Sequence, residues 1–168
     1  MILRSLRIFC RAFLVCGLAL TLASCGSTKK KTADTGAKIE KVKYFHLKDL
    51  TRNVITNDPS IPFEREYRLY GAVSVKERNE RMGHYYDILW KATDRSQPVT
   101  VRLEYRQQKS GLTIKTKEET VQAPKKGNVT RFNVVGEEYT KDGPVNSWRV
   151  TLVRGKEVLS EEKSYLWE

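Results

Sequence analysis

The sequence predicts an all-β fold, an antiparallel β-sandwich of about seven strands, and three observations support it. Apolar and polar residues alternate with period two along most of the chain after Arg65, which is typical of strands with one buried face. Isolated glycines and prolines separate the alternating segments, as tight turns require. After residue 25, no segment repeats apolar residues at the i, i+3, i+4 spacing of an amphipathic helix.

Seven segments are expected to form the strands. They are residues 68–75, 84–93, 99–106, 112–122, 129–136, 147–154 and 156–167. Alternation is clearest in VTVRLEYR (99–106), where it assigns Leu103 to the core and Arg102 to solvent. We also expect Trp90 and Trp148 in the core between two sheets. The turn at Gly155 predicts a tight hairpin between the last two strands.

Two further segments are less regular. Residues 44–66, which contain the loop TNDPSIP (56–62), are expected to add an edge strand. The charged run KERNERM (76–82) fits either one helical turn or a long hairpin loop. A small closed barrel agrees with the alternation almost as well as a sandwich does.

The number and spacing of the strands over residues 65–168 resemble those of immunoglobulin-like and fibronectin type III-like sandwiches. The chain lacks the cysteine pair of antibody domains. The resemblance implies two antiparallel sheets that face each other across one core.

The first 25 residues have the three zones of a secretory signal. Three basic residues come first, followed by the nearly apolar segment 12–22, and Ala23 and Ser24 then precede Cys25. The basic residues are Arg4, Arg7 and Arg11. The apolar segment has 11 residues, whereas a membrane-spanning helix needs about 20. We therefore predict that residues 1–24 form a removable signal peptide.

The sequence Leu22-Ala23-Ser24-Cys25 resembles the lipobox of bacterial lipoproteins. That resemblance implies cleavage before Cys25, diacylation of its sulfur and, commonly, acylation of its new amino group. Two or more acyl chains give lasting membrane attachment, whereas one chain gives marginal binding. Cys25 is therefore the predicted lipidation site, and the cell envelope is the expected location. The alternatives are an ordinary signal peptide in which Cys25 is incidental, or a buried apolar helix.

Lipidation would have two further consequences. Cys10 and Cys16 would be lost with the signal peptide, so the mature chain would keep Cys25 alone and form no internal disulfide. By the same resemblance, Gly26 in place of an acidic residue implies the outer membrane in a bacterium with two membranes. The sequence leaves open whether the protein faces the periplasm or the cell surface.

Residues 25–43 are predicted to be a lipidated, lysine-rich flexible tether that precedes a β-sandwich domain of residues 44–168. Gly, Ser, Thr and Lys dominate the tether, and such a composition buries too little apolar surface to fold. Without the three signal-peptide arginines the net charge falls from +11 to +8, and the tether carries +4 of this. Export removes nucleic acid as a partner, so an anionic bilayer surface or a charge-extended spacer explains the charge.

The mature sequence offers little for catalysis, and we predict no catalytic residue, no metal site and no cofactor. Its histidines are His46 and His84, and zinc sites with Cys-rich or HExxH spacing are excluded. A metal site formed by the two histidines and one carboxylate remains an alternative, and so does an acyl-transfer site at His84. Asp58, Glu64 and Glu66 lie close together in sequence, and paired carboxylates can hydrolyse glycosides.

Aromatic residues are numerous in the predicted domain. The set comprises Tyr85, Tyr86, Trp90, Tyr105, Tyr139, Tyr165 and Trp167. Exposed aromatic side chains can stack on sugars or anchor protein interfaces, but core packing is the simpler explanation for most of this set. We expect a lipid-anchored envelope protein whose non-catalytic β-sandwich binds or scaffolds a protein or glycan partner. The alternative is an envelope hydrolase that uses a carboxylate pair on the β domain.

Overall fold

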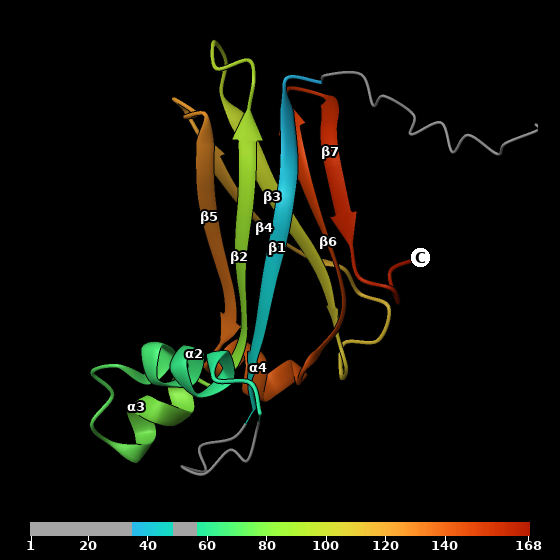
Figure 1. Ribbon diagram of the computed structural model, residues 1–168. Helices are drawn as coiled ribbons and strands as arrows, with labels where there is room; N and C mark the ends of the chain where they lie inside the picture. Colours follow the sequence, from blue (N-terminus) through green and yellow to red (C-terminus); the bar gives the residue numbers. More distant parts are fainter. Residues whose placement is uncertain (1–34, 49–56) are drawn as a thin grey trace, which may run out of the picture. The chain divides into compact units, whose positions relative to one another are not determined.

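The computed structural model describes residues 35–48 and 57–168, which form seven strands and three short helices (Figure 1). The strands are β1 (Ala37–Leu47), β2 (Gly83–Ala92), β3 (Val99–Gln107), β4 (Lys115–Val121), β5 (Gly127–Val135), β6 (Val145–Arg154) and β7 (Glu157–Lys163). The helices are α2 (Ser60–Leu69), α3 (Val75–Glu80) and α4 (Glu137–Asp142). Cys25, the signal peptide and the first part of the predicted tether lie outside the described residues. None of the described helices is long and apolar enough to cross a membrane.

The strands form two antiparallel sheets that pack face to face, which confirms the predicted sandwich (Figure 1). One sheet has the order β1-β2-β5 and the other the order β4-β3-β6-β7. In the constant-type immunoglobulin arrangement the fourth strand joins the sheet of the first, second and fifth strands. Here β4 pairs with β3 instead. The sheets remain separate, so the closed-barrel alternative is wrong.

The core between the sheets follows the predicted alternation. Val101, Leu103 and Tyr105 of β3 are fully buried, whereas Arg102 keeps part of its surface in solvent. Trp90 of β2 is also buried. The core thus forms mainly from the apolar faces of the other strands, since β4 contributes no buried residue and only Val121 packs against the core.

Trp148 is partly buried at the edge of this core, where its ring meets Tyr86 edge-on. After β7 the chain turns back rather than extending the strand to residue 167 as predicted. The backbone N–H of Ser164 donates to the Trp148 carbonyl. The guanidinium groups of Arg106 and Arg149 lie 4.5 and 5.2 Å from the centre of the Trp167 ring. This packing explains why Trp167 is buried although it lies outside a strand.

The domain begins earlier than predicted, because β1 starts at Ala37 and not near Tyr44. The prediction of an edge strand is confirmed, but the assignment of residues 37–43 to a flexible tether is wrong. Ala37 and Ile39 are buried against the second sheet, while Lys38 and Glu40 face solvent. Four charged side chains on the exposed face gave this half-strand the composition of a tether.

The segment 68–75 is not a strand, and this prediction is wrong. Its first residues end α2, and Val75 begins α3. Helix α3 has a capping box, in which the Ser74 side chain accepts from the Glu77 backbone and Glu77 accepts from the Ser74 backbone. The alternative of a helical turn in residues 76–82 is therefore confirmed. Helix α4, which connects β5 to β6, was not predicted.

Candidate docking surface

Helix α2 carries its aromatic side chains on the solvent side. Phe63, Tyr67 and Tyr70 are 67%, 56% and 85% exposed. Their spacing of four and three residues places Phe63 and Tyr67 on one helical face, and Tyr70 continues this stripe at the helix end. All ten residues of α2 remain at least partly accessible. An aromatic stripe that faces water in this way is unusual, since such a stripe normally packs against the core.

The polar face of α2 attaches the helix to the sandwich. Arg68 has only 11% of its side chain exposed, and it bridges Glu64 at 3.2 Å and Asp87 of β2 at 3.0 Å. The Arg68 guanidinium also lies 4.7 Å from the centre of the Tyr85 ring. The same guanidinium lies 5.1 Å from the centre of the Tyr67 ring. Ion pairing and stacking therefore hold the helix in place, while Phe63, Tyr67 and Tyr70 each keep more than half of their surface in solvent.

Two more exposed apolar side chains follow α2, at the start of α3. Val73 and Val75 are both strongly exposed. An open groove of about 410 Å³ separates α3 from α4, and Val75, Asn79, Gly136 and Thr140 are among its lining residues. We call the side chains of Phe63, Tyr67, Tyr70, Val73 and Val75 the α2 docking surface. It exceeds the isolated apolar residues that are ordinary on protein surfaces.

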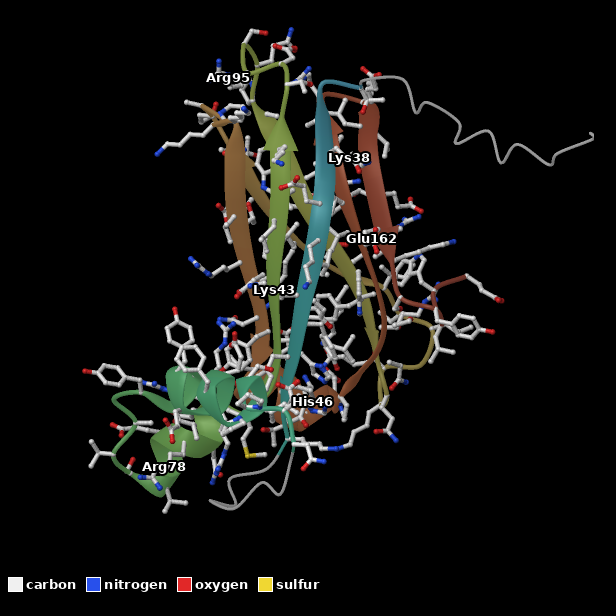
Figure 2. The ribbon with its side chains drawn as sticks, in the orientation of Figure 1. Lys38, Lys43, His46, Arg78, Arg95 and Glu162 are labelled. Carbon is white, nitrogen blue, oxygen red and sulfur yellow. The ribbon has the colours of Figure 1, made fainter. Side chains whose placement is uncertain are left out.

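This surface lies at one particular end of the sandwich. Strand β1 begins at Ala37 beside Ala92 and ends at Leu47 beside Gly83, just after α3. The three helices therefore lie at the end opposite to the point where the chain enters β1 (Figure 1). In the side-chain view, Lys38 marks the entry end, and Arg78 marks the helical end (Figure 2). The two ends are separated by the length of β1, about 35 Å.

The two histidines meet at the helical end of the sheet. His46 and His84 are register partners, and their rings stack with centroids 3.8 Å apart. The His84 Nε2 atom accepts the Val145 backbone N–H at 3.0 Å, so its Nδ1 atom carries the proton and donates to the Tyr44 hydroxyl at 2.8 Å. Burial, with His46 alongside, lowers the pKa of His84 to about 3.

This geometry argues against both histidine alternatives. Both His84 ring nitrogens are already hydrogen-bonded, so the ring has no free nitrogen with which to activate a nucleophile. The His46 Nε2 atom is paired with the Tyr139 hydroxyl at 2.9 Å. Within residues 35–48 and 57–168, no three His, Cys, Asp or Glu side chains lie close enough together to hold a metal ion.

The three carboxylates considered for hydrolysis do not converge. Asp58 accepts hydrogen bonds from the backbone N–H and the hydroxyl of Ser60. Glu64 pairs with Arg68, while the neighbouring Glu66 is exposed on another side of α2. Two catalytic carboxylates must flank one substrate bond at a separation of about 5–10 Å. Asp58 and Glu64 instead have structural partners, as most surface carboxylates do.

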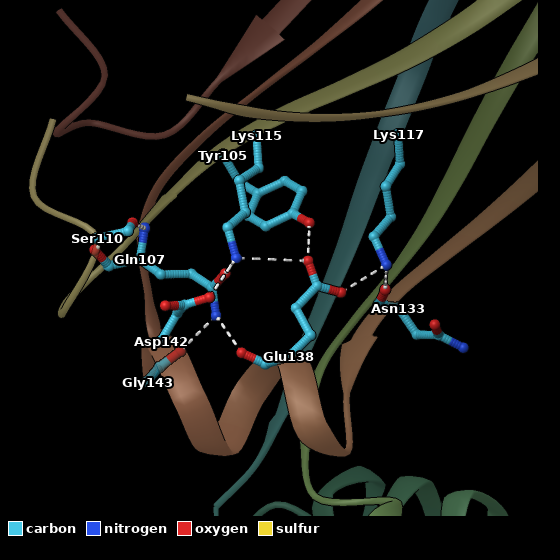
Figure 3. Close-up of polar contacts among 9 residues, drawn as sticks. All are labelled: Tyr105, Gln107, Ser110, Lys115, Lys117, Asn133, Glu138, Asp142 and Gly143. Carbon is cyan, nitrogen blue, oxygen red and sulfur yellow. Dashed lines mark hydrogen bonds and ion pairs between the residues drawn. The ribbon is translucent and has the colours of Figure 1, made fainter. Parts of the chain in front are cut away.

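A denser polar network fixes helix α4, as Figure 3 shows. The Lys115 ammonium donates to the Gln107 side chain at 2.8 Å and to Asp142 at 2.5 Å. The Gln107 amide donates to the carbonyls of Glu138 and Gly143 at 3.1 and 2.8 Å. Residues from β3 and β4 thereby hold both ends of α4.

Glu138 is the centre of the other half of this network (Figure 3). It accepts hydrogen bonds from Tyr105 and from the Lys117 ammonium. Burial alone would raise the pKa of Glu138, but hydrogen bonds from Lys117 and Tyr105 outweigh burial and lower it. Each charge in the network has an opposite charge or a hydrogen-bond partner, so the network stabilises the attachment of α4 to β3 and β4.

Most of the aromatic residues that the sequence singled out are structural. Tyr85, Tyr86, Trp90, Tyr105 and Trp167 are buried, and Tyr139 is half-buried; only Tyr165 of this set is exposed among the described residues. The residues that sequence reasoning missed are Phe63, Tyr67 and Tyr70. Their spacing of four and three residues fits one helical face, but it covers only two turns, and the alternation in residues 68–75 favours a strand.

No protein-family model, curated protein or solved structure matches this chain.

Proposed function

We propose that the chain is a lipid-anchored protein of the bacterial cell envelope whose β-sandwich domain binds a partner and catalyses no reaction. The resemblance of residues 22–25 to a lipobox supports the anchor at Cys25. The exposed α2 docking surface is the observation that supports binding, because it leaves five large apolar side chains, close together in sequence, in contact with water.

The position of the surface agrees with a tethered binding module. Cys25 precedes the start of β1 by 12 residues, which reach at most about 40 Å when extended. The docking surface lies at the other end of β1, so an anchored domain can present it away from the attachment point. We also propose the outer membrane as the site of attachment, on the basis of Gly26.

Metabolic labelling with a palmitate analogue tests the anchor. We expect label on the wild-type protein and on Cys16→Ser, which keeps the thiol at position 25. Cys25→Ser should carry no label and should leave the membrane fraction, because a hydroxyl cannot form the thioether. Label that persists in Cys25→Ser would contradict the proposed anchor.

A further inference from the structure

The geometry points to an apolar groove on another envelope protein as the partner of the α2 docking surface, with a basic side chain at the rim of that groove. This inference rests on the proposed function of the domain as a binding module. It names the surface that binds and the chemistry that this surface recognises. A second copy of the chain and a lipid bilayer are the competing occupants.

The area of the surface suits a protein interface. The exposed fractions of Phe63, Tyr67 and Tyr70 together equal about two whole aromatic residues, or roughly 300–500 Å² at 150–250 Å² for each. An interface of standard size buries about 800 Å² on each partner, of which about 56–65% is apolar. The stripe with Val73 and Val75 therefore supplies most of the apolar area that one partner contributes.

The shape of the surface suits a groove. Side chains four and three residues apart on one helix are the anchors of the helix-in-groove mode of recognition. Helix α2 is already fixed in its helical conformation by the Arg68 bridge to Asp87, so binding requires little ordering of this segment. Large aromatic side chains that enter pockets are also the residues that contribute most to binding energy.

The charge beside the stripe distinguishes between the possible occupants. Glu66 immediately precedes Tyr67, is exposed, and makes no hydrogen bond or ion pair with the described part of the chain. The basic residues on either side of Glu66 are not free. Arg65 has a partner, and Arg68, whose guanidinium lies 5.1 Å from the centre of the Tyr67 ring, is engaged by Glu64 and Asp87. The available charge at the edge of the stripe is thus negative, and a basic group on the partner would complement it.

This charge disfavours the two competitors. An antiparallel pairing of α2 with its own copy about Tyr67 would bring two Glu66 carboxylates together, which like-charge repulsion opposes. Helices that lie on anionic bilayers carry free lysine or arginine beside their apolar face. Helix α2 instead offers a carboxylate there, and its Arg68 is bound to the sandwich.

Photo-crosslinking in intact cells identifies the occupant. We would place benzoylphenylalanine at Tyr67, or in a second variant at Tyr70, in the full-length chain. Tyr165, which is 97% exposed and lies beyond β7, is the control position. We expect positions 67 and 70 to give one discrete protein adduct that position 165 does not give. The mass of this adduct should differ from twice the mass of the monomer.

Binding of the identified, purified partner to the full-length chain then tests the chemistry. The double change Phe63→Ser and Tyr67→Ser should weaken binding at least tenfold, and Glu66→Lys should weaken it several-fold, more so at low salt. Tyr165→Ser should leave it unchanged. Unaltered urea midpoints would show that these surface changes leave the fold intact.

Other outcomes overturn the inference, and they separate it from the proposed function. An adduct of twice the monomer mass identifies a second copy, and a lipid adduct alone identifies the bilayer; unchanged binding by Glu66→Lys contradicts the basic rim. A protein adduct from position 165 but not from 67 or 70 rejects this surface yet keeps the domain as a binding module. If none of the three positions gives an adduct, the result contradicts both this inference and the proposed function of the domain as a binding module.

Discussion

His46 stacks on His84 across the first strand pair, with 3.8 Å between the ring centroids and a tilt of 16° between the ring planes. Two imidazolium cations could not share this geometry without strong repulsion. Burial and nearby Lys48 also lower the pKa of His46, and burial lowers that of His84 to about 3. The folded protein therefore disfavours protonation of either ring.

The histidine pair predicts that stability falls as the solution is acidified below about pH 6.5. Each folded-state pKa lies below the unfolded value, so the unfolded chain binds more protons between pH 6.5 and about 3. The contribution to stability is therefore complete above pH 6.5 and declines as the pH falls through this window. Urea unfolding at pH 7.5 and pH 5.2 measures this loss of stability. Both pH values lie above the range in which most carboxylates titrate.

Replacement of one ring provides the control for this prediction. His46→Gln removes the second imidazole, so the fall in urea midpoint between pH 7.5 and pH 5.2 should be smaller than in the wild type. An equal fall in both proteins would show that the dependence comes from groups other than this pair.

Leu103→Ala should destabilise the domain far more than Arg102→Ala. Leu103 is fully buried between the sheets, and its loss leaves a cavity that costs about 2–5 kcal/mol. Arg102 pairs with Glu118 at 2.5 Å, but both side chains are substantially exposed, so the pair contributes less than about 1 kcal/mol. Urea midpoints of the two variants are the measurement. A greater loss from Arg102→Ala would reverse the assignment of the two faces of β3.

Strand β3 was predictable because it has one face in water. In β3 the polar residues Arg102 and Glu104 alternate with buried ones, and this pattern survives in the sequence without knowledge of the fold. Strand β1 begins with the same pattern at Ala37, but the pattern breaks at the register shift between Ile39 and Lys41, and its exposed lysines resemble those of the preceding tether. The composition of residues 37–43 indicates a tether, whereas the alternation at Ala37 and Ile39 indicates a strand. The residues form a strand because Ala37 and Ile39 are buried against the second sheet.

The docking surface was not predictable by the same reasoning. An amphipathic pattern is normally read with its apolar side inward, whereas α2 turns Phe63 and Tyr67 to solvent and Arg68 to the sandwich. The contact that turns the polar face of α2 toward the sandwich joins Arg68 to Asp87, which are 19 residues apart in sequence. The stacking of His46 on His84 likewise depends on strand register, which neither histidine's local sequence reveals.

Gly83→Ala should be strongly destabilising, and Gly111→Ala is its matched control. Both glycines have positive φ, +140° and +61° respectively, so both variants incur backbone strain of about 1–2 kcal/mol. At Gly83 a Cβ atom would also collide with the backbone carbonyl of Val134 on β5, whereas the space around Gly111 is open. We expect an additional cost of about 1–3 kcal/mol at Gly83. Equal urea midpoints for the two variants would contradict the close approach of β2 and β5.

Glu138→Ala should weaken the attachment of α4, whereas Glu137→Ala should not. Glu138 accepts hydrogen bonds from Tyr105 and Lys117, and its removal leaves a buried tyrosine hydroxyl and a half-buried ammonium without this partner. Loss of a carboxylate from such a site costs about 1–3 kcal/mol.

Glu137, its exposed neighbour on the same helix, tests whether the loss reflects the network or helix propensity alone. Hydrogen exchange should show faster opening of residues 137–142 in Glu138→Ala, because the network fixes this helix to β3 and β4. The groove between α3 and α4 has one wall on this helix, so the same variant should also increase exchange at Gly136 and Thr140. If Glu137→Ala accelerated exchange in α4 as much as Glu138→Ala, the carboxylate network would not be what holds the helix.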